Sequence, residues 1–154
     1  MIITTWNIRG LNSRGKHRYL KERSKNDGPS IMILQEMKIS EKNLQEIMEN
    51  YKPQYQVIGH DANGSAGGLS IIWNLGEIWF EDWVSIPRIL SGRLRVIGSR
   101  DCVFLKGVYG PHISREKRAF LQNLENMRSL YLDDLWVVGG DFNMIISLVK
   151  KGEA

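Results

Sequence analysis

The sequence predicts a layered α/β fold, and three observations support this prediction. Residues 31–34 form a continuous apolar run, which is typical of a strand that is covered on both faces. Leu44, Ile47, Met48 and Tyr51 recur at helical spacing, which is typical of an amphipathic helix. The composition, with 42% hydrophobic and 25% charged residues, is ordinary for a globular protein. We therefore expect one domain, residues 1–154, of about eight short strands and three helices.

In the amino-terminal half, strands are expected to alternate with helices. Residues 1–6 are β-branched and aromatic and predict the first strand. Ser13 is placed to cap a helix that ends before the breaker sequence at 26–29. After the strand at 31–34, Ser40 is placed to cap the second helix. The first helix is rich in basic residues, which we interpret as a solvated face in preference to a nucleic-acid contact. They are Arg14, Lys16, His17, Arg18, Lys21, Arg23 and Lys25.

The carboxyl-terminal half is predicted to be mostly strand. Residues 94–97 and 102–108 are expected to form a hairpin around the turn at 98–101. Ser114 is placed to cap the last helix, whose apolar residues keep helical spacing as far as Tyr131. The remaining apolar or aromatic segments predict strands at 55–59, 69–73, 78–86 and 135–138, and a glycine-rich loop at 60–68 separates the first two.

Four of the predicted strands end in polar side chains. These side chains are Asn7, Glu36, Tyr109 and the pair Asp141 and Asn143. In extended backbone, residues two apart point to the same side, so Asp141 and Asn143 can face one small ligand. A Gly-Gly-Asp turn capped by Asn is also an ordinary way to end a strand. Because ligand sites in layered α/β proteins gather outside strand ends, we expect the five side chains to converge.

The predicted site is rich in oxygen ligands. It combines two carboxylates with amides and a phenol, and it contains no cluster of cysteine and histidine. Such ligands suit a hard cation, Mg²⁺ or Mn²⁺, and disfavour zinc. A site of this kind serves the hydrolysis of phosphate esters, because the metal neutralises phosphoryl oxygens while a carboxylate orients or deprotonates the attacking water.

Charge and cysteine content suggest a partner and a compartment. The net charge of +4 and the isoelectric point near 9.3 are compatible with a polyanionic partner such as DNA. Cys102 is the only cysteine, so we expect a reducing compartment, nuclear or cytoplasmic. No apolar run of spanning length and no leader pattern is present, so no membrane association is expected.

Several short motifs together resemble a known superfamily. They are Trp6-Asn7-Ile8-Arg9-Gly10-Leu11, Gln35-Glu36, Val108-Tyr109-Gly110-Pro111 and Gly139-Gly140-Asp141-Phe142-Asn143. In this order and spacing they resemble the endonuclease/exonuclease/phosphatase superfamily. More closely, they resemble the apurinic-endonuclease-like domain at the front of plant LINE-type retrotransposon polyproteins. Gly67-Gly68 followed by Trp73-Asn74 fits that subgroup as well.

This resemblance implies a four-layered α/β sandwich and metal-dependent cleavage of phosphodiesters in DNA. Glu36 would then be the Mg²⁺ ligand, and Asn7 would help to hold the metal or the phosphate. Asp141 would orient or activate the water, Asn143 would donate to the scissile phosphate, and Tyr109 would contact it.

Two features of the sequence depart from the family. Apurinic endonucleases carry an acidic residue two places after the motif asparagine, where this chain has Arg9, which is a candidate for phosphate contact instead. The family also continues beyond the Gly-Asp-Phe-Asn motif to further strands and a late Asp-His pair, whereas this sequence stops first. None of its three histidines lies at that motif, and His112, in a loop, is expected to be solvated rather than catalytic.

The resemblance therefore covers about the front two thirds of the family's domain, and we expect a sandwich that is truncated at its C-terminus. Cleavage is expected to be weak or absent. The inner sheet face should be uncovered, which would favour a homodimer. Two alternatives to the endonuclease remain open at this point. One is a non-catalytic remnant that binds nucleic acid or protein, and the other is a phosphomonoesterase of the same superfamily.

Overall fold

The computed structural model describes residues 1–11, 13–23, 25, 28–60, 68–129 and 135–144. Within these residues there are eight strands and three helices, as predicted. Their order is β1 (Ile3–Asn7), α1 (Arg14–Arg23), β2 (Ile31–Gln35), α2 (Glu41–Tyr51), β3 (Tyr55–His60), β4 (Leu69–Asn74), β5 (Ile78–Ile86), β6 (Ile89–Val96), β7 (Cys102–Tyr109), α3 (Ser114–Ser129) and β8 (Leu135–Asp141).

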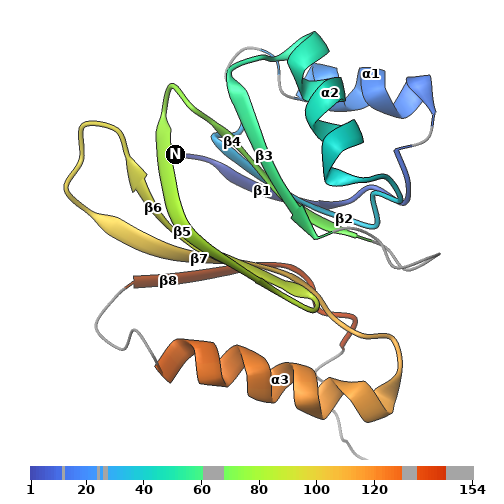
Figure 1. The fold of residues 1–154 in the computed structure, drawn as a ribbon, viewed down its shortest axis with the longest axis vertical. Helices are drawn as coiled ribbons and strands as arrows, with labels where there is room; N and C mark the ends of the chain where they lie inside the picture. Colours follow the sequence, from blue (N-terminus) through green and yellow to red (C-terminus); the bar gives the residue numbers. More distant parts are fainter. Residues whose placement is uncertain (12, 24, 26–27, 61–67, 130–134, 145–154) are drawn as a thin grey trace, which may run out of the picture.

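The strands form two mixed sheets of four strands each (Figure 1). The first sheet has the order β1-β2-β4-β3, and the second has the order β5-β6-β7-β8. Each sheet contains one parallel pair at one edge, β1 with β2 and β7 with β8, and its other pairs are antiparallel. The carboxyl ends of the strands in a parallel pair lie at the same edge of the sheet, so each sheet offers one such end for a site.

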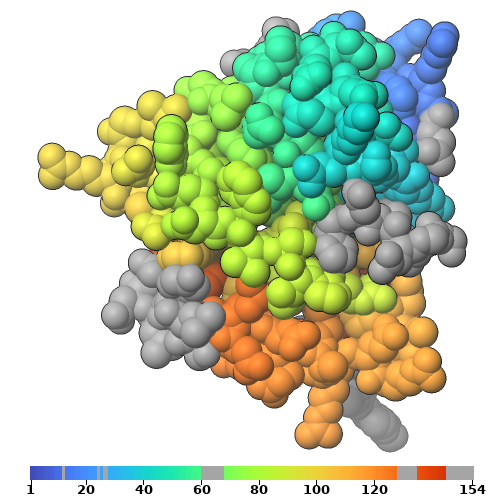
Figure 2. Space-filling view, in the orientation of Figure 1, coloured from blue at the N-terminus to red at the C-terminus, as the bar shows by residue number. Residues whose placement is uncertain are grey.

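Three apolar clusters hold the layers together. Helices α1 and α2 pack on the outer face of the first sheet through Leu20, Leu44 and Met48. Helix α3 packs on the outer face of the second sheet through Phe120 and its neighbours. The inner faces of the two sheets pack against each other. Figure 2 shows the same order from outside, with α2 at the top and the orange helix α3 at the bottom.

The predicted helix starts and strand runs are largely confirmed. Ser40 caps α2 by accepting a hydrogen bond from the Asn43 amide at 3.1 Å. β2 is buried along its whole length, as expected of a strand between two packed layers. The predicted hairpin is the antiparallel pair β6 and β7, whose turn projects at the left of Figure 2.

The prediction for the strand at 94–97 was too short. β6 already begins at Ile89, because Ile86 and Ile89 pair across a tight turn and extend the hairpin with β5. Arg88 adopts a left-handed conformation in that turn, with φ 70°. Residues 87–93 lack the alternating pattern that predicts a strand. The strand forms in this segment because it pairs with β5 and β7. Tyr131 and most of the loop at 60–68 lie outside the described residues.

The expectation of an uncovered inner sheet face is wrong for the described residues. Ile33 and Ile71 of the first sheet and Leu105 of the second are fully buried in one cluster between the sheets. The second sheet that was expected to be missing is therefore already formed by β5 to β8. The structure thus gives no support to a homodimer through an uncovered inner face. Self-association of the chain remains a prediction. Among the described residues, no helix is both long and apolar enough to cross a membrane.

Candidate active site

The candidate site lies where the two parallel strand pairs end. In the first sheet the last paired residues are Asn7 and Gln35, and in the second they are Tyr109 and Asp141. Because the sheets pack face to face, these ends lie close together, and three of them, Asn7, Gln35 and Asp141, line one cavity of about 640 Å³. The lining of this cavity, called the inner site below, is Thr5, Asn7, Gln35, His112, Gly140, Asp141, Phe142, Asn143 and Met144.

Asn7 connects the two predicted carboxylates. Its Nδ2 donates hydrogen bonds to Glu36 Oε1 at 3.2 Å and to Asp141 Oδ2 at 3.0 Å. Glu36 and Asp141 are 105 residues apart in the sequence, and the side-chain amide of Asn7 binds both. Bridging by a neutral donor keeps two negative groups close without a cation between them. The predicted convergence of Asn7, Glu36 and Asp141 is therefore a feature of the folded chain.

Tyr109 completes the cluster from the second sheet. Its hydroxyl donates to Glu36 Oε1 at 2.8 Å. Burial, the hydrogen bond to Glu36 and the charges of Glu36 and Asp141 raise the pKa of Tyr109 from 10 to about 12. Burial alone would raise the pKa of Glu36, but the hydrogen bonds from Tyr109 and Asn7, with the charges of Lys38 and His112, hold it below its usual 4.5. Glu36 is thus an ionised acceptor and Tyr109 a protonated donor at neutral pH.

His112 contacts this cluster, which sequence reasoning did not predict. It is exposed, as expected, but its Nε2 lies 3.0 Å from the Tyr109 hydroxyl. Since the phenol proton is donated to Glu36, the phenol oxygen accepts from His112 Nε2–H. The result is a chain of donors from His112 through Tyr109 to Glu36. In the sequence, the only sign of this contact is that His112 follows Tyr109 by three residues. The turn after β7 brings the two side chains together.

Asn143 stands next to the cluster but is already engaged. Its backbone amide donates to Asp141 Oδ1 at 2.9 Å, and its side-chain Nδ2 donates to the Gly110 carbonyl at 2.7 Å. It adopts a left-handed conformation, with φ 50°, which asparagine tolerates better than most residues. Asn143 therefore fixes the Asp141 carboxylate and joins the ends of β7 and β8.

Close backbone approach explains two of the glycines beside the site. A Cβ at Gly110 would lie 2.0 Å from the Phe142 carbonyl oxygen, and one at Gly140 would lie 2.0 Å from the Val108 carbonyl oxygen. Gly140 also has a positive φ of 143°. Only residues without a side chain fit here, so these glycines bring the Tyr109 and Asp141 ends of the strands together.

The loop after β1 is held by helix α1. Lys16 Nζ donates to the carbonyls of Ile8 at 2.9 Å and Arg9 at 2.8 Å, and His17 Nε2 contacts the Leu11 carbonyl. We expected Lys16 and His17 to belong to a solvated face, but both are half-buried and bind this loop. Arg9 is exposed and is not part of the cavity lining. Sequence reasoning missed Lys16 as a residue that positions the Asn7 segment.

The donor set fits a hard divalent cation. Asn7 Oδ1 is buried and has no hydrogen-bond partner among the described residues, although both hydrogens of its amide nitrogen are directed at carboxylates. An unpartnered amide oxygen on the residue that binds both carboxylates adds an oxygen ligand of the kind that Mg²⁺ or Mn²⁺ accepts, with substrate and water oxygens completing the shell. Within the described ranges, no three of His, Cys, Asp and Glu gather into a metal cluster, so these side chains would supply only part of the coordination.

This geometry defines an α/β protein with an oxygen-rich site at the ends of two parallel strand pairs. The chain belongs to the endonuclease/exonuclease/phosphatase family, whose model matches residues 4–147. Among curated protein sequences, no significant match is found.

Solved structures of this family share the fold. D. rerio TDP2, humanized by 14 mutations, is 15% identical, with a TM-score of 0.69 over 93% of this chain and 66% of its own. A Bacteroides thetaiotaomicron mannosyl-6-phosphatase is 19% identical, with a TM-score of 0.70 over 92% of this chain and 64% of its own. The human Nocturnin catalytic domain with bound sulfate is 17% identical, with a TM-score of 0.65 over 91% and 62%. The chain thus spans about two thirds of the length of these structures.

Proposed function

We propose that this chain carries the site of a Mg²⁺-dependent phosphodiester hydrolase that acts on DNA. The observation that carries the proposal is the hydrogen-bonded set of Asn7, Glu36, Asp141 and Tyr109, of which Asn7 and Asp141 line one open cavity. The net charge of +4 favours a polyanion over a small phosphorylated substrate.

Each side chain then has a chemical task. A Mg²⁺ ion held by Glu36 and Asn7 Oδ1 would neutralise charge on the phosphoryl oxygens. Asp141, whose carboxylate is fixed by Asn7 and Asn143, orients the attacking water and accepts its proton. Tyr109 stays protonated and donates its hydroxyl proton to Glu36, which holds that carboxylate in place, and His112 Nε2–H donates to the phenol oxygen.

We further propose an origin in plant LINE-type retrotransposons and a nuclear or cytoplasmic location, on the motif resemblance and on the single cysteine. Residues 144–154 contain neither the aspartate nor the histidine of the family's late Asp-His pair. Each missing donor typically costs orders of magnitude in rate, so cleavage by this chain is expected to be slow.

Nicking of supercoiled plasmid DNA, with enzyme in excess over DNA, tests the proposal. We expect slow nicking that requires Mg²⁺ or Mn²⁺ and falls by roughly 100-fold or more in Asp141→Asn, since a general base is lost. Asp101→Asn, an exposed aspartate in the β6–β7 turn, is the matched control. Nicking that persists without metal, or that Asp141→Asn leaves unchanged, would reject the assignment. Hydrolysis of a phosphomonoester without nicking would favour the phosphomonoesterase, and DNA binding without cleavage would favour the non-catalytic remnant.

A further inference from the structure

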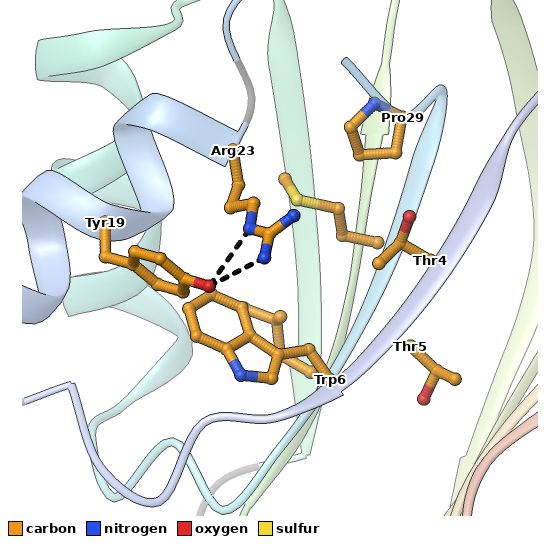
Figure 3. Close-up of a pocket in the computed structure, with 8 residues that line it drawn as sticks. Thr4, Thr5, Trp6, Tyr19, Arg23 and Pro29 are labelled. Atoms are coloured by element: carbon orange, nitrogen blue, oxygen red, sulfur yellow. Dashed lines mark hydrogen bonds between the residues drawn. The ribbon is translucent and has the colours of Figure 1, made fainter.

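A second cavity lies on the other face of β1, between this strand and α1. Its volume is about 250 Å³. Figure 3 shows Tyr19 and Arg23 reaching from α1 toward Trp6 on β1, with Thr4 and Pro29 on the opposite wall. This cavity, called the outer pocket below, is lined by Thr4, Thr5, Trp6, Tyr19, Arg23, Pro29, Met32 and Leu34.

The outer pocket has an apolar floor and an aromatic wall. Pro29, Met32 and Leu34 are buried beneath it. Trp6 and Tyr19 meet edge to face, with ring centroids 4.9 Å apart, and Tyr19 is 42% exposed. Interior packing normally leaves no space of this size, and a solvent-accessible hollow over apolar side chains suits a flat apolar ligand.

A cation stands at the rim of the outer pocket. Arg23 donates to the Tyr19 hydroxyl through Nε at 3.1 Å and Nη2 at 2.8 Å, and its guanidinium lies 5.2 Å from the Tyr19 ring centroid. These contacts hold the guanidinium in place without neutralising it. Within the part of the chain that the structure describes, no carboxylate lies within ion-pair distance of Arg23. A fixed, unneutralised guanidinium beside aromatic rings favours an anionic group on the ligand.

The outer pocket and the inner site are separated only by β1. Thr5 lines both cavities, and β1 is the edge strand of its sheet, with exposed Thr4 and Thr5. Along β1, alternate residues point to opposite faces, so Asn7 serves the inner site and Trp6 the outer pocket. An extended chain of phosphates at the inner site can therefore cross the β1 edge and reach the outer pocket.

We propose that the outer pocket holds one unpaired nucleotide of a nucleic-acid strand, with its base against Trp6 and Tyr19 and its phosphate on Arg23. That the ligand belongs to a nucleic-acid strand rests on the proposed function. A cavity of about 250 Å³ is slightly below the usual range for a whole ligand, roughly 300 to 1,000 Å³, and suits one ring system of a larger one. The Thr4 hydroxyl, on the same face of β1 as Trp6, is placed for the polar edge of a base or for a sugar. The chemistry selects single-stranded or locally opened nucleic acid, because a paired base cannot enter.

The test is an NMR titration without divalent metal, in which the indole N–H of Trp6 is followed. The signal that is missing from the spectrum of Trp6→Leu is assigned to Trp6. The probes are deoxyadenosine monophosphate, deoxyadenosine, inorganic phosphate, a short single-stranded oligodeoxyadenylate and a hairpin duplex. We expect the monophosphate to shift the signal at lower concentration than deoxyadenosine or phosphate. The single strand should bind more tightly than the monophosphate, and the duplex more weakly than the single strand.

Arg23→Gln should weaken binding of the monophosphate about tenfold, so that its affinity equals that of deoxyadenosine. Arg95→Gln removes the same charge from an exposed position on β6 and should leave the affinity for the monophosphate unchanged. Trp6→Leu, with folding checked by circular dichroism, should weaken binding of the single strand about tenfold in calorimetry. Equal weakening in the two arginine variants, or a Trp6 signal that inorganic phosphate shifts as readily as the monophosphate, would overturn the proposal. So would a single strand that leaves the Trp6 signal unmoved.

The two proposals can fail separately. Binding in the outer pocket is measured without metal and without turnover, so it does not depend on cleavage. Nucleotide binding at Trp6 together with failure of the nicking test would reject the hydrolase and keep the pocket. Metal-dependent nicking together with an unmoved Trp6 signal would reject the pocket alone.

Discussion

The two faces of β1 carry two kinds of surface. On the inner side, Asn7 is tied to Glu36 and Asp141, and the polar groups hold one another in place. On the outer side, Trp6 and Tyr19 form an aromatic wall with the cation of Arg23 at the rim. Neighbouring residues in the sequence thus serve different chemistry because a strand alternates its side chains. The difference shows that in this protein the edge strand β1, more than any loop, sets what the two cavities can bind.

The inner side depends on long-range contacts, whereas the aromatic wall of the outer side depends on local ones. The inner donors come from β1, β2, β7 and β8, whose ends meet only when both sheets have formed. The outer wall comes from β1 and the helix that follows it, within a short stretch of chain. Substitutions should therefore separate the two regions, and the predictions below test how far.

The largest expected effect is that of Glu36→Gln on metal binding. Because a formal charge leaves the ligand set, Mn²⁺ affinity should fall by roughly 10- to 100-fold. Calorimetry or Mn²⁺ relaxation measures this, with the exposed Glu125→Gln on α3 as control. Nucleotide binding in the outer pocket should stay unchanged. Equal Mn²⁺ binding by wild type and variant would remove Glu36 from the site.

The same variant should change the response to acid. The pKa of Glu36 lies below 4.5 in the folded chain, so the stabilisation that it contributes is present above the unfolded value and is lost as pH falls through the folded value. The free energy of unfolding should therefore drop more for wild type than for Glu36→Gln between about pH 6 and about pH 3. Urea denaturation at both pH values provides the comparison.

An intermediate effect is expected for His112. His112→Ala removes the donor to Tyr109 and should slow metal-dependent nicking about tenfold, less than the loss of a donor acting directly on phosphate. His112→Asn keeps an N–H donor at the same position and should recover part of the rate. Mn²⁺ affinity should change little in either variant. If both variants nick at the wild-type rate under single-turnover conditions, His112 is only a neighbour of the site.

The smallest effect should come from Lys16, which links the two regions. Lys16→Met removes two hydrogen bonds from a charged donor to the loop after Asn7 and should lower the free energy of unfolding by about 1 kcal/mol. Arg18→Met loses the same charge from an exposed position and should stay within about 0.5 kcal/mol of wild type. Urea unfolding gives both values. A Lys16→Met variant as stable as Arg18→Met would mean that α1 does not hold the inner loop.

Sequence reasoning reached the elements and most of the inner site, but not the outer pocket. The polar residues Asn7, Glu36, Tyr109 and Asp141 stand at strand ends, and this local pattern was enough to predict their convergence. The contacts of His112 and Lys16 were not predicted, because their partners, a phenol and two carbonyls, become neighbours only through turns. Trp6 and Tyr19 give no signal as a pair, since aromatic residues in a strand and a helix usually mean core packing.

The sequence by itself determined the apolar periods, the caps and glycines, and the chemical character of the strand ends, because these depend on residues within a few positions of one another. Only the tertiary structure decided that β5 to β8 form a second sheet over the first, that His112 joins the Tyr109–Glu36 chain, and that α1 leaves a pocket beside Trp6. These features depend on which strands pair and on how layers pack. Pairing between distant segments is set by the free energy of the whole core, which no local pattern contains.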